Sequence, residues 1–209
     1  MRDNFKLIRD YITFDSKDDF YFLQILQRKK DGPGPDGVQI TGTNNKARAI
    51  KSYCITSKEY LDSIEYEVKQ LCNFFNARAM MYVSKRSFKL VALENMKLCT
   101  DNIYHDNYTH SRTNYWKACG LSYCQTEKIY LVDIDAEDMH MLDIIRNYIE
   151  STTIMSKAKP GKRIILEVPT KTGVHLLCHP FDVATLQKFY PKPNHEFVHK
   201  NSPTCVYIP

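Results

Sequence analysis

Residues 128–135 constrain the fold most, because they combine an apolar strand pattern with two acids one residue apart (Lys-Ile-Tyr-Leu-Val-Asp-Ile-Asp). Side chains of a β-strand point alternately to opposite faces. Asp133 and Asp135 therefore share one face, while Val132 and Ile134 share the other. Two carboxylates held close together repel each other unless a proton or a cation lies between them. Divalent cations bound by oxygen ligands commonly serve phosphates, so the segment indicates a metal site.

The order of the elements after residue 127 predicts where these acids lie. The pattern predicts strand, helix, strand, strand, helix and strand over residues 128–135, 137–150, 163–168, 174–178, 183–189 and 204–208. This βαββαβ order is that of a ferredoxin-like sheet. Its first and third strands are adjacent and antiparallel, so His175 should lie beside Asp133 and Asp135, on the face that the helices leave open. Every second residue of the third strand, beginning with Val174, should face the helices.

Residues 1–127 are expected to form an α/β module. The pattern predicts helices and strands over residues 3–13, 20–27, 47–55, 56–75, 79–84 and 88–98. The capping box Thr56-Ser-Lys-Glu59 should begin the long helix with Thr56 as its N-cap. Residues 99–127 are aperiodic and are expected to be an ordered connector. The fold class is therefore α+β, an N-terminal α/β module packed on a C-terminal RRM-like sheet (128–209), together one domain.

Composition excludes several classes of protein. The chain has 209 residues, 43% of them hydrophobic, which is enough to bury a substantial core. It has neither an apolar leader nor a run of roughly 18 apolar residues, so we expect a cytoplasmic location and no membrane partner. The seven cysteines include no Cys-x-x-Cys pair and indicate a reducing compartment. The net charge of +5 permits a nucleic-acid partner without requiring one.

The strand end Val132-Asp-Ile-Asp135 and the turn Thr170-Lys-Thr-Gly-Val-His175 are the two motifs of this region. Together they resemble the catalytic core of the archaeo-eukaryotic primase superfamily, the primase-polymerases, in its small phage or mobile-element form. The resemblance is strongest over residues 128–180. It implies that Asp133 and Asp135 bind two divalent cations, Mg²⁺ or Mn²⁺, and that His175 contacts the phosphates of the incoming nucleotide. The implied activity is template-directed nucleotidyl transfer from NTP or dNTP on single-stranded DNA, with a helicase, if one is needed, supplied in trans.

The family has a third acid on or near its last strand, and here the pattern departs from it. The acids after His175 are Asp182, at the far end of the third strand, and Glu196, which approaches the last strand from the correct end. Glu196 is therefore the preferred third metal ligand. Glu167, near the end of the second strand, is a further candidate on geometry alone.

Two groups of cations could contact phosphates. Arg28, Lys29 and Lys30 adjoin a Gly-Pro loop, and with Arg48 on the returning strand they could form a patch for template or primer phosphates; a solvated loop is the alternative. Lys171 in the turn and Lys200 before the last strand are expected to bind the nucleotide.

The connector contains residues of the types that bind zinc or stack on bases. Zinc is not expected, because no close pair of ligands occurs among Cys99, His105, His110, Cys119 and Cys124. Core packing is favoured over base stacking for the aromatic residues Tyr104, Tyr108, Tyr115 and Trp116.

Two other functions stay open. A replication-initiator nickase also uses a ferredoxin-like sheet, with metal-binding histidines and a tyrosine nucleophile, for which His175, His179 and Tyr190 would be the candidates. A non-catalytic nucleic-acid-binding module with a degenerate primase site is the second alternative.

Overall fold

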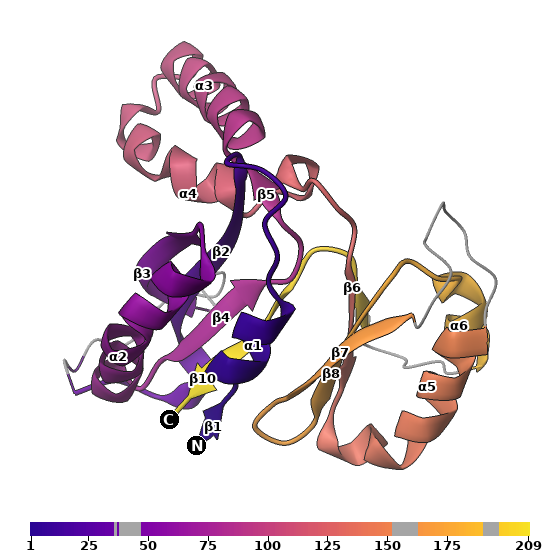
Figure 1. Cartoon of the computed structure of the whole chain (residues 1–209). Coiled ribbons are helices and arrows are strands. Elements are labelled where there is room, and N and C mark those ends of the chain that lie inside the picture. Colours follow the sequence, from indigo (N-terminus) through magenta and orange to yellow (C-terminus); the bar gives the residue numbers. More distant parts are fainter. Residues whose placement is uncertain (36, 38–46, 152–162, 190–196) are drawn as a thin grey trace.

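The computed structural model describes residues 1–35, 37, 47–151, 163–189 and 197–209, and within these ranges the chain forms two antiparallel sheets and six α-helices (Figure 1). The first sheet has the order β1-β10-β4-β2-β3, with β5 paired to β2 outside this path. Its strands are β1 (Arg2–Asp3), β2 (Asp19–Arg28), β3 (Ala47–Ile55), β4 (Arg78–Tyr82), β5 (Arg86–Ser87) and β10 (Pro203–Ile208).

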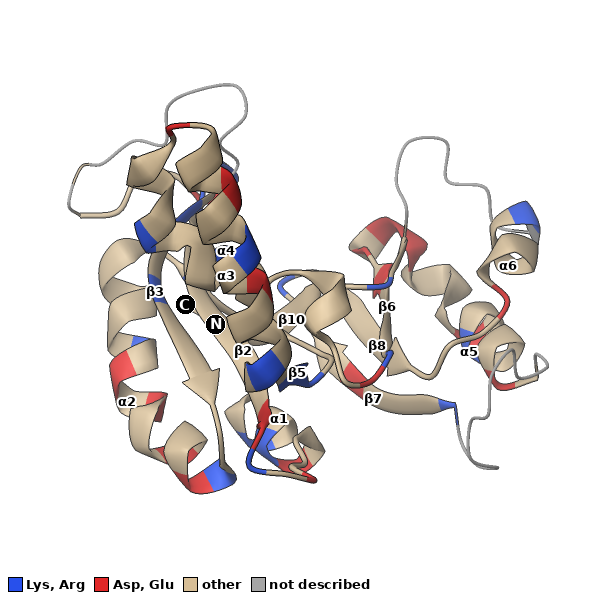
Figure 2. Cartoon of the chain, turned by 90° about the horizontal axis from the view of Figure 1, so that it is seen from above, with Lys and Arg blue, Asp and Glu red and all other residues tan. Residues whose placement is uncertain are grey.

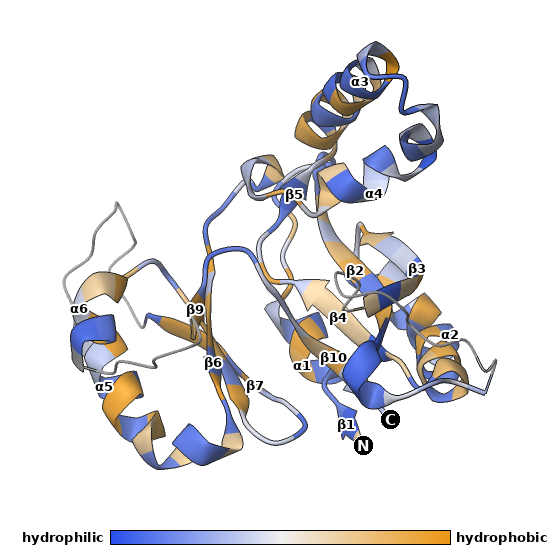
Figure 3. Cartoon of the chain, turned by 180° about the vertical axis from the view of Figure 1, so that it is seen from behind, coloured by the Kyte–Doolittle hydropathy of each residue, from blue (hydrophilic) through white to orange (hydrophobic). Residues whose placement is uncertain are grey.

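Strand β2 is buried on both faces, because the first sheet is covered by helices on both sides. Tyr21 and Leu23 belong to the larger core, which includes residues of α1 (Phe5–Tyr11) and α2 (Lys58–Phe75). Phe20 and Phe22 alternate with them and pack against α3 (Phe88–Tyr104) and α4 (Asn114–Cys119). Figure 3 shows hydrophobic residues along β2, β4 and one side of α2.

The second sheet has the order β7-β8-β6-β9, all antiparallel. Its strands are β6 (Tyr130–Ile134), β7 (Ile164–Pro169), β8 (Val174–Cys178) and β9 (Val198–His199). The helices α5 (Leu142–Ser151) and α6 (Val183–Phe189) lie on its outer side, away from the first sheet (Figure 1). Val132, Val174 and Leu176 share one core cluster with Ile145 of α5 and Leu186 of α6. The prediction that Val174 and its alternate neighbours face the helices is confirmed.

The inner face of the second sheet was predicted to be open, and this is wrong for part of it. Leu131 and Leu177 belong to the same core cluster as Leu23 and Val68 of the N-terminal part. These leucines share a face with Asp133 and His175 by alternation. Burying them requires the two sheets to pack together at one end, which leaves the polar residues at the border of the contact.

The last strand lies in a different sheet from the one predicted. Strand β10 has nearly the predicted bounds, but it pairs with β4 and β1 of the first sheet. The fourth position of the second sheet is taken by the two-residue β9, which pairs with β6. The burial of five of the six residues of β10 explains the error, because a strand buried on both faces carries no alternation to identify its sheet.

Other differences are local. Ser57, rather than Thr56, caps α2, and its hydroxyl accepts a hydrogen bond from the amide of Tyr60 at 3.0 Å. The expected connector is largely helical: α3 runs on to residue 104, and α4 follows the 3-10 helix η2 (Tyr108–Thr113) and precedes η3 (Ser122–Cys124). None of the helices in the described ranges has the length and apolar character needed to cross a bilayer.

Candidate functional site

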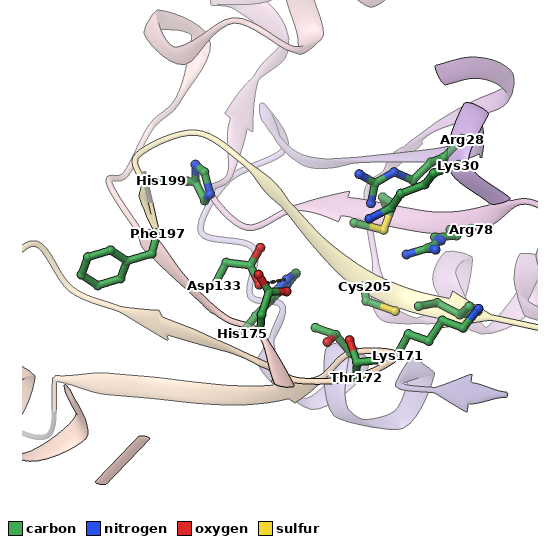
Figure 4. A pocket seen from close by; sticks show the side chains of 14 residues that line it. Arg28, Lys30, Arg78, Asp133, Lys171, Thr172, His175, Phe197, His199 and Cys205 are labelled. Atoms are coloured by element: carbon green, nitrogen blue, oxygen red, sulfur yellow. Dashed lines mark ion pairs between the residues drawn. The ribbon is translucent and has the colours of Figure 1, made fainter. Parts of the chain in front are cut away.

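Asp133 and His175 are direct cross-strand partners. Strands β6 and β8 place the two residues opposite each other in the antiparallel register, and His175 Nε2 lies 3.3 Å from Asp133 Oδ1 (Figure 4). The side chain of His175 is 10% exposed and that of Asp133 is 38% exposed. The acid is therefore open to a ligand, and the imidazole is held behind it.

Glycine at position 173 makes this pairing possible. A Cβ at this position would lie 2.0 Å from the carbonyl oxygen of Ile134 and 3.0 Å from the Cα of Asp135. The turn therefore packs directly against the backbone at the end of β6. The Thr170 hydroxyl accepts a hydrogen bond from the Gly173 amide at 3.0 Å, and the Thr170 amide donates to the Gly173 carbonyl at 2.9 Å.

The N-terminal residues fix the same turn from outside the second sheet. The Arg2 guanidinium donates from Nε to the carbonyl of Thr170 at 2.9 Å. The Asn4 side chain donates to the carbonyls of Pro169 and Cys205, at 2.8 and 3.1 Å. These bonds join the hairpin of β7 and β8 to β10, so both sheets hold the turn in place.

The acids and the histidine line a pocket of about 350 Å³ between the two sheets (Figure 4). This volume lies within the usual range for small-molecule sites. The second sheet and its turn contribute Asp133, Asp135, His175 and Lys171 to the pocket. The first sheet and the adjoining residues contribute three cations and several apolar side chains, namely Arg28, Lys30, Arg78, Met80, Cys205 and Ile208. A second hollow of about 320 Å³ shares Asp133, His175 and Arg28 and adds apolar residues such as Leu26 and Pro203.

The cations of the pocket come from different elements, and one of them is already paired with an acid. Arg78 is paired with Asp31 through two hydrogen bonds, so much of its charge is already balanced. Arg28 ends β2, and Lys30 lies in the 3-10 helix η1 (Lys29–Asp31) that follows it. Lys171 comes from the turn between β7 and β8. Cations from both sheets therefore line one cleft together with the two acids.

The remaining predicted cations lie elsewhere. Lys29 and Arg48 do not line the pocket, and Arg48 lies over the Phe75 ring at 5.7 Å and donates to Gln27 at 3.4 Å. Lys200 does not line it either, and its ammonium group lies 5.9 Å from the centre of the Tyr130 ring. The structure thus brings Arg28, Lys30 and Lys171 together and leaves these three apart.

The candidates for a third acid have separate outcomes. Glu196 lies outside the described residues. Glu167 is on the helix side of the second sheet, where both of its oxygens bind the Arg146 guanidinium at 2.9 Å. The prediction from geometry that Glu167 could be the third metal ligand is therefore wrong. Asp182 directly precedes α6, and the Thr185 hydroxyl and amide donate to it and lower its pKa.

Acidic residues gather just beyond β6 (Figure 2). Asp135, Glu137 and Asp138 hold carboxylate oxygens within 4.8 Å of one another at the start of the 3-10 helix η4 (Ala136–Met141). Within the described ranges this is the one cluster of three or more metal-ligating side chains at such spacing, and neither Asp133 nor His175 belongs to it. Asp135 therefore lies between the pocket and this exposed group.

Sequence reasoning missed several residues of the site, among them one from β9 and one from β10. His199 lines both hollows and comes from β9, opposite Leu131 of β6. Thr204, in β10, places its hydroxyl oxygen 2.9 Å from Nδ1 of His175. A two-residue strand shows no pattern, and the position of Thr204 depends on which sheet β10 joins, so neither residue could be found from local sequence.

The zinc-type and aromatic residues of the former connector divide between the core and the surface. Cys119 and Cys124 are buried with Phe20 and Phe22. Trp116 stacks on Phe22, but Tyr104 and Tyr108 are 82% and 61% exposed, so core packing is wrong for these two tyrosines.

No protein-family model, curated protein or solved structure matches the chain significantly.

Proposed function

We propose that the protein is a metal-dependent nucleotidyl transferase of the primase-polymerase kind that acts on single-stranded DNA. One observation carries the proposal: Asp133 and His175 are paired at 3.3 Å on adjacent strands, and they share a cleft with Asp135, Arg28, Lys30 and Lys171. Carboxylates that bind a divalent cation, next to cations that bind phosphates, are what the transfer of a phosphoryl-linked nucleotide requires.

The topology of the second sheet supports this proposal. From its order β7-β8-β6-β9, with α5 and α6 on one face and the first and third strands central, we infer a βαββαβ ferredoxin-like arrangement. The resemblance to the primase-polymerases implies the same arrangement. The difference is that the last long strand, β10, leaves this sheet and closes the cleft from the first one.

The donor atoms of the site fit a hard divalent cation. Asp133 and Asp135 both line the cleft and offer oxygen ligands, which Mg²⁺ and Mn²⁺ prefer. A bound ion would offset the repulsion between the carboxylates and supply charge stabilisation to a triphosphate. Arg28 and Lys30 would hold the phosphates from the side of the first sheet, and Lys171 from the turn beside the acids. His175 would share its Nε2 hydrogen between Asp133 and a phosphate oxygen.

The number of acids favours one tightly held ion over two. In the described part of the chain, Asp133 and Asp135 are the acids that line the two hollows of the cleft. A second ion would need Glu196 or the group next to Asp135, which extends away from His175. One strong site for Mn²⁺ is therefore the expected stoichiometry.

Synthesis on a DNA template tests the proposal. Purified protein supplied with a single-stranded template, all four NTPs or dNTPs, and Mn²⁺ should make labelled oligomers. Asp133→Asn should abolish them, because it removes a ligand charge at nearly constant volume. Asp143→Asn is a matched control, since Asp143 is an exposed acid of α5, paired with Arg146 and remote from the cleft. Equal synthesis by Asp133→Asn and the wild type would refute the mechanism.

The alternatives predict other outcomes of the same experiment. A nickase would become covalently attached to the DNA, but no tyrosine is among the described residues that line the cleft, and Tyr190 lies outside the described ranges. His179 does not line the cleft, and its amide donates to the carbonyl of Arg163. A non-catalytic module would bind the oligonucleotide without binding Mn²⁺ or nucleotide.

A further inference from the structure

His175 is held from two sides by residues of different sheets. Its Nε2 faces Oδ1 of Asp133 at 3.3 Å, and its Nδ1 lies 2.9 Å from Oγ1 of Thr204. An ionised carboxylate only accepts hydrogen bonds, so the hydrogen that faces Asp133 is carried by Nε2. In the neutral ring Nδ1 is then an acceptor, and the Thr204 hydroxyl donates to it. The two contacts together select one tautomer and one orientation of the ring.

Thr204 is fixed by the first sheet, independently of the strand that carries His175. It has no exposed surface, and in β10 it pairs with Met81 of β4. A β-branched side chain in a buried strand has little rotational freedom, so the hydroxyl has a defined position. The neighbouring Cys205 lines the cleft, and its carbonyl accepts a bond from Asn4. The oxygen that faces His175 therefore moves only if β10 moves.

We propose that Thr204 is a positioning residue that keeps the Nε2–H of His175 directed to the Asp133 side of the cleft, where this hydrogen faces Asp133 and would be shared with a phosphate of a bound nucleotide. This inference rests on the proposed function, and it adds to the site a residue of the first sheet that orients His175. Nε2 is the ring nitrogen next to Asp133, where the cation and the phosphates of a nucleotide would meet. A ring rotated to exchange its nitrogens would face the same phosphates with an acceptor, which repels their oxygens.

Loss of the hydroxyl should weaken nucleotide binding more than it slows the chemical step. In Thr204→Val, Nδ1 is buried without a donor, and the ring has no reason to keep its orientation. One hydrogen bond of ordinary strength corresponds to a rise in the KM for nucleotide of about three- to tenfold. Because the phosphates are held both before and during the transfer, kcat should change less than KM. Thr204→Ser keeps the hydroxyl and should retain the wild-type KM.

Nitrogen-15 NMR of the full chain, labelled at its seven histidines, reads the ring directly. His175→Gln assigns the signals by removing one set. At a pH where the ring is neutral, wild-type His175 should show a protonated Nε2 and an unprotonated, hydrogen-bonded Nδ1. Thr204→Val should displace the Nδ1 signal, and Thr204→Ser should leave it in place. An Nδ1 signal at the wild-type position in Thr204→Val would overturn the proposal, as would an unchanged KM.

The two measurements separate this inference from the proposed function. If the wild type makes no oligomers with any nucleotide, the transferase proposal fails, whereas the NMR comparison still decides whether Thr204 holds His175. Far-ultraviolet circular dichroism would reveal whether Thr204→Val folds. If it does not, Thr204→Ala takes its place, and its ring signals are compared with those of Thr204→Ser, which keeps the hydroxyl. Unchanged ring signals in Thr204→Ala would then refute the positioning role.

Discussion

Replacement of Gly173 by alanine should separate β6 from β8 at the candidate site. The added Cβ would lie 2.0 Å from the Ile134 carbonyl oxygen, and a carbon–oxygen contact normally needs about 3.3 Å, so the strands must move apart by roughly 1.3 Å. The same movement would take His175 Nε2, now 3.3 Å from Asp133, beyond the roughly 4 Å of an ion pair. The turn cannot relax easily, because Arg2 and Asn4 hold it.

The expected loss of stability follows from two costs. Overpacking of a well-packed region costs about 1–3 kcal/mol, and each ladder hydrogen bond lost costs about 1 kcal/mol. We therefore expect Gly173→Ala to lower the free energy of unfolding by about 2–4 kcal/mol, a large part of a typical total of about 5–15 kcal/mol. Equilibrium unfolding in urea measures this change, and Mn²⁺ binding followed by calorimetry should weaken in parallel.

Gly120→Ala is the matched control for this change. Its Cβ would meet Lys117 O at 3.4 Å and Tyr82 Oη at 3.5 Å, which are ordinary contacts. The free energy of unfolding of this variant should stay within about 0.5 kcal/mol of the wild type. If Gly173→Ala were as stable as Gly120→Ala and bound Mn²⁺ normally, the close approach at the end of β6 would not have the role inferred for it.

Three further predictions concern other parts of the structure. Asn4→Ala should lower the free energy of unfolding by about 1–3 kcal/mol in urea, because two backbone carbonyls lose their buried donor; an unchanged midpoint would contradict this. A hydrogen bond with the Cys119 thiol lowers the pKa of Cys54, and burial raises that of Cys178 to about 12, so iodoacetamide at pH 8 should modify Cys54 before Cys178, as peptide mass spectrometry would show. Burial raises the pKa of Tyr11 well above its usual value of 10.0, so the folded protein keeps this proton when the unfolded chain loses it. The free energy of unfolding should therefore fall as pH rises above 10, and less steeply in Tyr11→Phe; equal slopes would exclude the effect.

The second sheet could be predicted from the sequence because its evidence is local. The two acids one residue apart at the end of residues 130–135 assign the residues of β6 to its two faces, and the short turn makes β7 and β8 adjacent. Once β6 and β8 are neighbours, Asp133 and His175 must lie close together. The spacing of the motifs therefore determined the centre of the candidate site.

The other wall of the cleft could not be predicted, because it depends on contacts between distant segments. Arg78 and Met80 face the acids only because β4 lies beside β10. β10 has no alternation that would distinguish one sheet from the other, and β9 is two residues long. The hydroxyl of Thr204 reaches His175 as a consequence of that strand placement.

The return of β10 to the first sheet has a consequence for synthesis of the protein. Strands β1 and β4 pair with β10 on its two sides, although the whole second sheet is translated between β4 and β10 (Figure 1). During translation, β4 keeps an unpaired edge until residue 208 has left the ribosome, and unpaired edges promote aggregation of nascent chains. Such late, long-range pairing also slows folding. A chain stopped before residue 203 would therefore lack both the strand that joins the sheets and the means to protect that edge.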